Sequence, residues 1–471
     1  MVFSSIEFIF YFLPIVLLIY YLVPKRAKNV VLLIASLAFY AWGAPDFFLI
    51  FIFSMICNFL ITKKMHSTQN VMPRKIWLAL SLILNIGLLA YFKYMNFFMD
   101  NLNAILEYSH LSTLRFTRVA LPIGISFFTF QSISYTVDVY RKVSEPLRRW
   151  YDYMLYISLF PQLIAGPIIR YNTIADQLVD RDIPIVGRVE GFRRFAIGLG
   201  KKVLIANTLA IVADDVFAMD FHSMSSGTAW IGILAYTFQI YFDFSGYSDM
   251  AIGIGRMLGF RFSENFKVPY ISQSISEFWR RWHITLGGFM KEYLYIPLGG
   301  NRISKGRTYF NLWLVFLISG LWHGASWTFV LWGVFHGAFL IFDRLFMLDV
   351  LKKIGRFPSI LLTFFIVVLG WVIFRADTVG GAIDYYQALF AFRPGTTVFI
   401  SRQGYLFFVL AILFSFLPAL KIGDKWMGLF FNDASTKGSS IILYITSIVL
   451  FFLSVGALAV TDFNPFIYFR F

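Results

Sequence analysis

The chain has 471 residues, of which 58% are hydrophobic and 20% aromatic, and its mean hydropathy is +0.69. A soluble globular protein is about 25% charged, whereas 14% of this chain is charged. Apolar runs of membrane-spanning length recur from end to end, with no soluble block between them. This composition excludes a soluble protein. It predicts an all-α polytopic membrane protein with one transmembrane domain over residues 1–471.

The formal net charge of the chain is +15. In a membrane protein, basic loops lie on the cytoplasmic side and face the anionic lipid of the bilayer. No basic stretch resembles a folded soluble module, so we expect no nucleic-acid partner. Cys57 is the only cysteine, which excludes an intrachain disulfide. The N-terminus lacks a basic region and a small-residue cleavage site, so its first apolar run is predicted to be a span rather than a removed signal.

The first part of the chain alternates apolar runs with basic loops. Its runs predict a span, a short helical hairpin and a further span, over residues 6–23, 30–43, 47–61 and 76–98. The next run, 121–139, carries several polar side chains, so we expect it to pack against protein or a cavity rather than lipid.

A break and a loop are predicted before the second half of the chain. The segment 154–169 contains FPQLIAGP, whose prolines and glycine predict a broken or re-entrant helix. The polar stretch 170–194 is predicted to be a cytoplasmic loop. The span that follows, 195–217, is interrupted by Lys201 and Lys202.

The second half of the chain consists mainly of apolar runs. Together with the earlier ones they predict about ten to twelve transmembrane helices. The further spans are expected over residues 229–258, 309–321, 327–342, 360–373, 406–417 and 441–460.

The distribution of basic residues predicts the orientation of both termini. Basic loops follow the first span and the hairpin, and placing them inside puts the N-terminus outside. Three lysines precede the last span and only Arg470 follows it, so the C-terminus is also predicted to lie outside. The tail 461–471, TDFNPFIYFRF, is aromatic and nearly uncharged. We expect such a tail to bury itself against the membrane or the protein.

His323 is the leading candidate catalytic residue. It ends the apolar segment LWLVFLISGLWHG and lies between Trp322, a predicted substrate contact, and Gly324. Hydrocarbon penalises ionisable side chains, so such a residue is a functional candidate by default. A neutral imidazole suits the role of general base toward a hydroxyl nucleophile, because its pKa lies near working pH. The alternative is a structural histidine that bonds a backbone carbonyl.

His283 is the second candidate. It follows Trp279, Arg280, Arg281 and Trp282. One interpretation puts Arg280 and Arg281 on the phosphates of a carrier or coenzyme at the inner face, with Trp282 in contact with the substrate. The other is an interfacial histidine within an aromatic and basic belt.

Asp243 and Asp249 lie within an otherwise apolar run and indicate a polar cavity. They either bind substrate hydroxyls and orient a histidine, or pair with Lys201, Lys202 or Arg256 to hold helices together. No metal-binding, nucleotide-binding or serine-hydrolase motif occurs, so no metal site and no bound cofactor are predicted.

Several long strings of residues resemble one family. FFTFQSISYTVDVYR, FPQLIAGPIIR, YFDFSGYSDMAIG, NFKVPY, SISEFWRRWHITL, YLYIPLGGNR and SGLWHGASWTFVLWG are similar to the membrane-bound O-acyltransferases. The resemblance covers nearly the whole chain. It is strongest to the bacterial branch of alginate O-acetylation proteins, with teichoic-acid D-alanylation proteins more distant. In place of Gly287 and Gly288, relatives tend to have serine and a small polar residue.

The resemblance implies a fold and a reaction. The fold would be a bundle of transmembrane and re-entrant helices around a central tunnel. His323 would be catalytic, and His283 would act on the cytoplasmic side of the tunnel. An acyl group would pass from a cytoplasmic thioester, acetyl-CoA or an acyl carrier protein, to an acceptor across the membrane. The tail NPFIYFRF resembles a partner peptide whose tyrosine accepts the acyl group, which implies the same role for Tyr468.

These observations predict a transmembrane O-acyltransferase, most simply an O-acetyltransferase, of a bacterial inner membrane. It would serve O-acylation of a cell-surface polymer or exopolysaccharide, as in alginate biosynthesis. Its partners would be the bilayer, a secreted or membrane-anchored SGNH esterase-like transferase and a glycan polymer. The alternatives are a transporter or flippase for a lipid-linked glycan and a non-catalytic scaffold for a secreted transferase.

Overall fold

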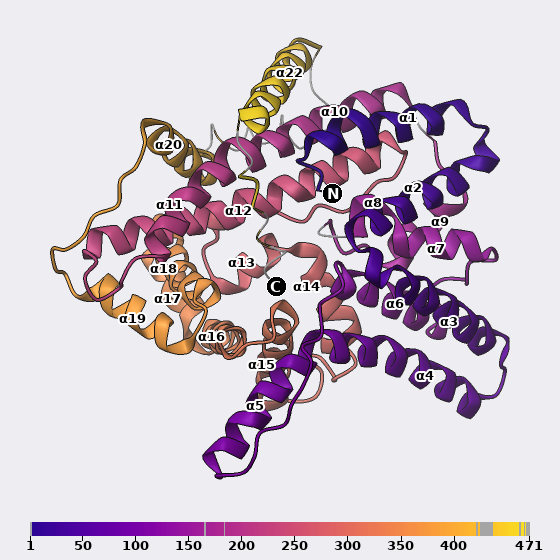
Figure 1. The fold of residues 1–471 in the computed structure, drawn as a ribbon, viewed down its shortest axis with the longest axis horizontal. Coiled ribbons are helices and arrows are strands. Elements are labelled where there is room, and N and C mark those ends of the chain that lie inside the picture. The colour runs from indigo at the N-terminus through magenta and orange to yellow at the C-terminus, as the bar shows by residue number, and fades with distance from the viewer. Residues whose placement is uncertain are drawn as a thin grey trace. The chain divides into compact units, whose positions relative to one another are not determined.

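The computed structural model describes residues 2–163, 166–182, 184–420, 423, 437–460, 463–465 and 467 (Figure 1). These residues form helices and no β-strand, apart from one isolated bridge between Met224 and Thr396. The predicted all-α class is therefore confirmed. The chain divides into two compact units, and a single domain over 1–471 stays a prediction. The first unit comprises residues 1–2, 7–184 and 258–262, and the second comprises 3–6, 185–257 and 263–471.

The first unit consists of helices, most of them apolar. Its helices are η1 (Phe8–Phe12), α1 (Leu13–Leu22), η2 (Lys25–Ala27), α2 (Lys28–Gly43), η3 (Pro45–Phe47), α3 (Phe48–Ser67), α4 (Val71–Leu89), η4 (Ala90–Tyr94), α5 (Met95–Tyr108), α6 (Ile125–Tyr140), α7 (Trp150–Ser158), α8 (Phe160–Leu163) and α9 (Tyr171–Val179). The predicted break at Ala44 and Pro45 is found between α2 and α3, where the 3-10 turn η3 begins. A packed hairpin of these two helices stays a prediction.

Buried polar side chains hold this unit together. Asn58 of α3 donates to Tyr153 of α7 at 2.8 Å, and Ser81 and Asn85 of α4 both donate to the Asn58 amide oxygen. Thr136 of α6 is within 3.0 Å of Ser81 Oγ. In a hydrophobic surrounding such polar groups must bond one another. The expectation that the run 121–139 packs against protein is thus confirmed.

The predicted break in the segment 154–169 is also found. Helix α7 ends at Ser158, Leu159 leaves the helical conformation, and α8 has four residues. The predicted loop over 170–194 is wrong. Residues Tyr171–Val179 form α9, and the following helix already begins at Ile185. Arg193 and Arg194 of that helix are buried, so a polar sequence concealed a largely buried helix.

The second unit contains the candidate site residues. Its helices are α10 (Ile185–Gly200), η5 (Lys201–Ala206), α11 (Asn207–Phe217), α12 (Ser226–Met257), η6 (Pro269–Ile271), α13 (Ile275–Arg281), α14 (Ile284–Met290), η7 (Lys291–Tyr295), α15 (Lys305–His323), α16 (Trp327–Phe342), η8 (Asp343–Met347), α17 (Leu348–Ile354), α18 (Arg356–Arg375), α19 (Val379–Phe390), α20 (Arg402–Phe416), η9 (Leu417–Ala419) and α22 (Lys437–Val460). Lys201 and Lys202 do not break their helix. They open the π-helical turn η5, a feature frequent at functional sites.

Helix α12 is the axis of this unit. It has 32 residues, nearly all buried, and is about 48 Å long at 1.5 Å per residue. Glycines let α10 approach it closely (Figure 1). A Cβ on Gly198 of α10 would lie 2.5 Å from the Gly246 carbonyl oxygen of α12, and one on Gly191 would lie 2.6 Å from that of Gly253. Small residues at such crossings allow backbone-to-backbone packing.

Helices α15 and α16 cross in the same way. A Cβ on Gly320 would lie 2.3 Å from the Phe329 carbonyl oxygen, and one on Gly333 would lie 2.5 Å from that of Phe316. This crossing lies one turn before His323, the last residue of α15. The position of His323 relative to α16 is therefore set by backbone contact.

Six helical segments of the described chain are long and apolar enough to cross a membrane. They are Pro45–Ser67, Val71–Tyr108, Ile185–Phe217, Arg356–Arg375, Arg402–Ala419 and Ile441–Val460. The protein is thus a multi-pass membrane protein. The larger count of ten to twelve spans and the central tunnel stay predictions.

The α10–α12 crossing is tested by Gly198→Ala. The added methyl group would overlap backbone atoms of α12, and overpacking of this kind costs about 1–3 kcal/mol. We expect a lower unfolding temperature of the purified protein in detergent. The matched control is Gly456→Ala on α22, where an added Cβ meets nothing within 4 Å. Equal unfolding temperatures for both variants would contradict the close crossing.

Candidate functional site

His323 lies in a chamber of aromatic rings in the second unit. Its side chain is buried, and its ring centroid lies 4.9 Å from Trp322, 5.1 Å from Trp332 of α16 and 5.4 Å from Phe374 of α18. These neighbours come from three helices, so the imidazole is held by packing from several directions. The surroundings of the ring are therefore mainly aromatic.

The structure brings His283 to the same chamber. The ring of His283 lies 6.1 Å from that of Trp322, so both predicted histidines contact one tryptophan. Phe244 of α12 packs edge-on against His283 at 4.7 Å. His283 is buried rather than exposed at an interface, which disagrees with the belt interpretation. The preceding residue, Trp282, which the sequence suggested as a substrate contact, is also buried. Its ring centroid lies 4.9 Å from that of Trp371.

The backbone at His283 makes a sharp turn between two short helices. Helix α13 ends at Arg281 and α14 begins at Ile284, with His283 at φ 46° and ψ 51° in the left-handed region. Non-glycine residues adopt this region rarely, at a cost in conformational energy. The turn directs the imidazole inward while the helices run on either side of it.

Asn265 determines which nitrogen of His283 carries the proton. Its amide oxygen accepts the backbone N–H of Thr285 at 3.3 Å and the Thr285 hydroxyl at 2.9 Å, and it lies 3.0 Å from His283 Nδ1. Its Nδ2 donates to Ser248 Oγ at 3.1 Å. Because a backbone N–H can only donate, the shared atom is an oxygen, and His283 Nδ1 must bear the hydrogen. The basic lone pair is therefore on Nε2.

His283 is uncharged near neutral pH. Helices α13 and α14 have seven residues each, so His283 lies outside the six candidate spans. Burial lowers its pKa to about 3, because the charged imidazolium loses hydration. A neutral ring with a defined tautomer can accept a proton or a hydrogen bond at Nε2.

Asp249 is held by two cations. Its carboxylate lies 2.6 Å from Arg194 of α10 and 2.6 Å from Lys201 of η5. Arg194 also pairs with Glu264, the neighbour of Asn265, at 2.5 Å. The pairing of Asp249 with Lys201 was the alternative expected from the sequence, and it is confirmed. This ion network links α10 and α12 to the loop that carries Asn265.

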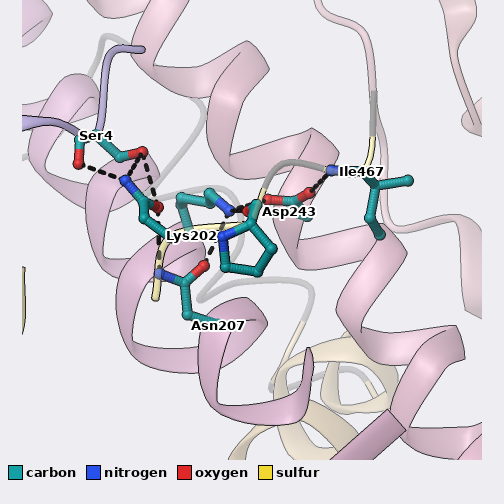
Figure 2. Close-up of polar contacts among 7 residues, drawn as sticks. Ser4, Lys202, Asn207, Asp243 and Ile467 are labelled. Atoms are coloured by element: carbon teal, nitrogen blue, oxygen red, sulfur yellow. Dashed lines mark hydrogen bonds and ion pairs between the residues drawn. The ribbon is translucent and has the colours of Figure 1, made fainter. Parts of the chain in front are cut away.

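The carboxylate of Asp243 lies 2.7 Å from the Lys202 ammonium group (Figure 2). Pairing of Asp243 with a lysine was also one of the two alternatives expected from the sequence. The pair also holds the C-terminal segment. The other oxygen of Asp243 accepts the backbone N–H of Ile467 at 2.9 Å, and Lys202 Nζ donates to the carbonyl oxygen of Pro465. Asn464 donates to the backbone oxygen of Ser4 at 2.9 Å. The segments at Ser4 and Asn464 thus meet beside a buried ion pair.

A cavity lies between Ile467 of the C-terminal segment and one ring of the aromatic chamber, that of Phe374. Its volume is about 210 Å³, and Ile467 and Phe374 are both in its wall. Phe374 contacts the His323 ring, so one aromatic side chain belongs to both the cavity and the chamber. The remaining lining residues are Tyr236, Gln239, Ser326, Thr328, Phe329, Arg375, Ala376 and Asp377.

The predicted phosphate-binding arginines differ in their surroundings. Arg280 is exposed, whereas Arg281 donates to Glu277 at 2.8 Å and to the Lys267 carbonyl at 3.1 Å.

Tyr468 lies outside the described residues. Among the residues that the structure describes, no group of three or more histidine, cysteine or acidic side chains is placed to hold a metal ion.

Asn265 was not found from the sequence. It lies within NFKVPY, in a stretch between α12 and α13 that has no helix of its own before η6. The one available signal is a polar amide next to Phe266, which is a weak indication. The contact itself depends on a loop returning to the turn at His283, and a single sequence does not show that return.

His323 and His283 are both buried within an all-helical, multi-pass membrane protein. The model of the membrane-bound O-acyltransferase family matches residues 149–352. The chain is 43% identical to the probable alginate O-acetylase of Pseudomonas putida, over all of both chains. It is 40% identical to the peptidoglycan O-acetyltransferase of Helicobacter pylori, over 86% of this chain and 82% of that one.

A more distant relative is the teichoic acid D-alanyltransferase of Streptococcus thermophilus, 25% identical over 47% of this chain and 56% of that one. The chain belongs to the membrane-bound O-acyltransferase family. It is therefore an acyltransferase, as the sequence predicted.

The role of Asn265 is tested by Asn265→Ala. Without the amide oxygen, the His283 ring is free to turn and to exchange tautomers, so we expect acyl transfer to fall about 10–100-fold, the range typical for residues that orient a reactive ring. The measurement is the initial rate of transfer per folded, monodisperse protein. The control is Asn311→Ala, which removes a buried amide bonded to Leu298 and Gly300 instead. Equal losses in both variants would contradict a specific role.

Proposed function

We propose that this acyltransferase moves an acetyl group from a cytoplasmic thioester to a polysaccharide outside the cell. The relatives named for alginate O-acetylation and peptidoglycan O-acetylation support an acetyl group and a glycan acceptor. The donor is acetyl-CoA or an acyl carrier protein thioester, and the location is a bacterial inner membrane with both termini outside. A secreted or membrane-anchored SGNH-type transferase completes the transfer to the polymer.

The observation that carries this proposal is the shared wall between the His323 chamber and the cavity lined by Ile467. Asp243 and Lys202 hold the backbone up to Ile467, and Tyr468 is the next residue. The described part of the tail therefore reaches the wall of this cavity at Ile467, the residue that precedes Tyr468 in the sequence. This supports Tyr468 as the acyl acceptor within the protein.

The chemical step follows from these groups. His323 takes the proton of the Tyr468 hydroxyl as that oxygen attacks the thioester carbonyl. The carbon–oxygen bond forms, the carbon–sulfur bond breaks, and the departing thiolate takes the proton back from His323. The products are a tyrosyl acetate ester and the free thiol. The partner transferase then moves the acetyl group to a glycan hydroxyl and restores the tyrosine.

The other predicted site residues have roles consistent with this scheme. His283, with its lone pair on Nε2, assists on the donor side beside Trp322 and Trp282. Arg280 and Arg281 lie on α13 and would bind donor phosphates. Asp243 binds the acceptor tail rather than a free sugar. Asp249 acts through its ion pairs with Arg194 and Lys201 and supports the Asn265 loop.

Removal of the His323 imidazole tests the chemical step. General-base catalysis contributes about 10²–10⁴ in rate, so His323→Ala should lose acyl transfer by that factor while the protein still inserts into the membrane. The measurement is incorporation of isotopically labelled acetyl into protein and polymer in cells. His222→Ala, which changes an exposed histidine, is the control. Normal polymer acetylation by His323→Ala would overturn the assignment.

Removal of one hydroxyl tests the acceptor. Tyr468→Phe keeps the aromatic ring but has no nucleophilic oxygen, so mass spectrometry of the C-terminal peptide should find no acetyl label and polymer acetylation should stop. Tyr405→Phe, at an exposed tyrosine of α20, should leave both readouts unchanged. Full polymer acetylation by Tyr468→Phe would show that the acetyl group reaches the glycan by another route.

A further inference from the structure

Basic side chains line a cavity in the first unit, and none of the proposed acyl-transfer residues is among its lining residues. The cavity has a volume of about 170 Å³. Its wall comes from the start of α2, the start of α7 and the end of α9. The lining residues are Lys25, Arg26, Lys28, Asn29, Arg149, Tyr151, Val179, Asp180 and Arg181.

The charges in this wall are mainly positive. Five of the lining residues are lysine or arginine, and Asp180 is the only carboxylate among them. Lys25 has a carboxylate partner just outside the wall, Asp182 at 3.7 Å, but both side chains are largely exposed. A pair of that kind contributes little. The cavity therefore keeps an excess of positive charge that an anion would neutralise.

Arg181 is held in one orientation inside this cavity. Its Nε donates to the Tyr20 hydroxyl at 3.1 Å, and its Nη1 donates to the Asn29 amide oxygen at 2.8 Å. The guanidinium lies 4.2 Å above the ring of Phe260. Its Nη2 is buried and has no hydrogen-bond partner among the residues that the structure describes. A fixed guanidinium with a spare donor matches the geometry of phosphate oxygens.

One helix terminus adds to the site. Tyr151 is the second residue of the nine-residue helix α7. The N–H groups of a first turn have no partner within their helix and favour a nearby anion. At the start of α2, by contrast, the backbone N–H of Lys28 already donates to the carbonyl oxygen of Lys25.

We propose that this cavity binds the phosphate group of an anionic molecule. Arg181 contacts the phosphate through Nη2, and Lys25, Arg26 and Arg149 surround it from the exposed side. The phosphate belongs either to a lipid headgroup or to a soluble metabolite, and the basic loops place the site on the predicted cytoplasmic side. The proposal does not depend on the acyl acceptor or on the histidines.

Two probes distinguish these sources with the full-length protein. Phosphatidic acid, added to nanodiscs of phosphatidylcholine, reports a lipid phosphate by native mass spectrometry of retained lipid. Inorganic pyrophosphate, titrated into the protein in phosphatidylcholine nanodiscs, reports a soluble phosphate by calorimetry. The variant K25Q/R26Q/R149Q removes three exposed cations of the cavity, and K63Q/K64Q/K75Q removes three exposed cations elsewhere in the same unit.

We expect at least one probe to bind the wild type, and its affinity to fall about tenfold or more in the cavity variant while the control variant changes little, because charge-assisted bonds are local. Arg181→Lys keeps the charge but not the planar fork, so it should also weaken binding. The probe that responds identifies the source. Failure of both probes to bind, or equal losses in the two triple variants, would overturn the proposal.

Discussion

The buried pair of Lys202 and Asp243 is the interaction on which the proposed acceptor geometry depends. Both side chains are almost fully buried, and removing one member of such a pair typically costs about 3–5 kcal/mol, because a charge is left unpaired. Each of the two side chains also forms hydrogen bonds outside the ion pair. Lys202 uses it for Asn207 and the Pro465 carbonyl, and Asp243 uses it for the Ile467 N–H. A charge pair that holds two helices thereby fixes the path of the C-terminal segment.

Close packing of helices gives this pair and the histidines their positions. Glycines at the α10–α12 crossing bring η5, and with it Lys202, against α12. Glycines at the α15–α16 crossing set His323 beside Trp332. Between helices in lipid, hydrophobic burial gives little driving force, so close backbone packing and bonded polar groups have to provide it. The same rule explains why Asp249, Arg194 and Glu264 form a connected network.

The sequence predicted the class of the protein and residues that the structure brings together. Composition indicated a polytopic helical protein, and intramembrane charges indicated the pairing of Asp243 and Asp249 with lysines. An apolar segment indicated His323, and a run of tryptophans and arginines indicated His283; both histidines contact Trp322, while their catalytic roles stay predictions. The prediction from sequence failed where polar residues turned out to be buried. The stretch before Arg194 looked like a loop because arginine is usually exposed, yet ion pairs bury that side chain in α10. Asn265 was missed because its role arises from a contact between a loop and a distant turn.

The most direct test of this arrangement is the hydrogen-exchange rate of the Ile467 amide, resolved by mass spectrometry in the wild-type protein and in Asp243→Ala. If the ion pair holds the tail, the wild-type amide exchanges slowly, and the substitution raises its rate to that of a free peptide. An Ile467 amide that already exchanges at the free-peptide rate in the wild type would contradict the claim that Asp243 positions the segment before Tyr468.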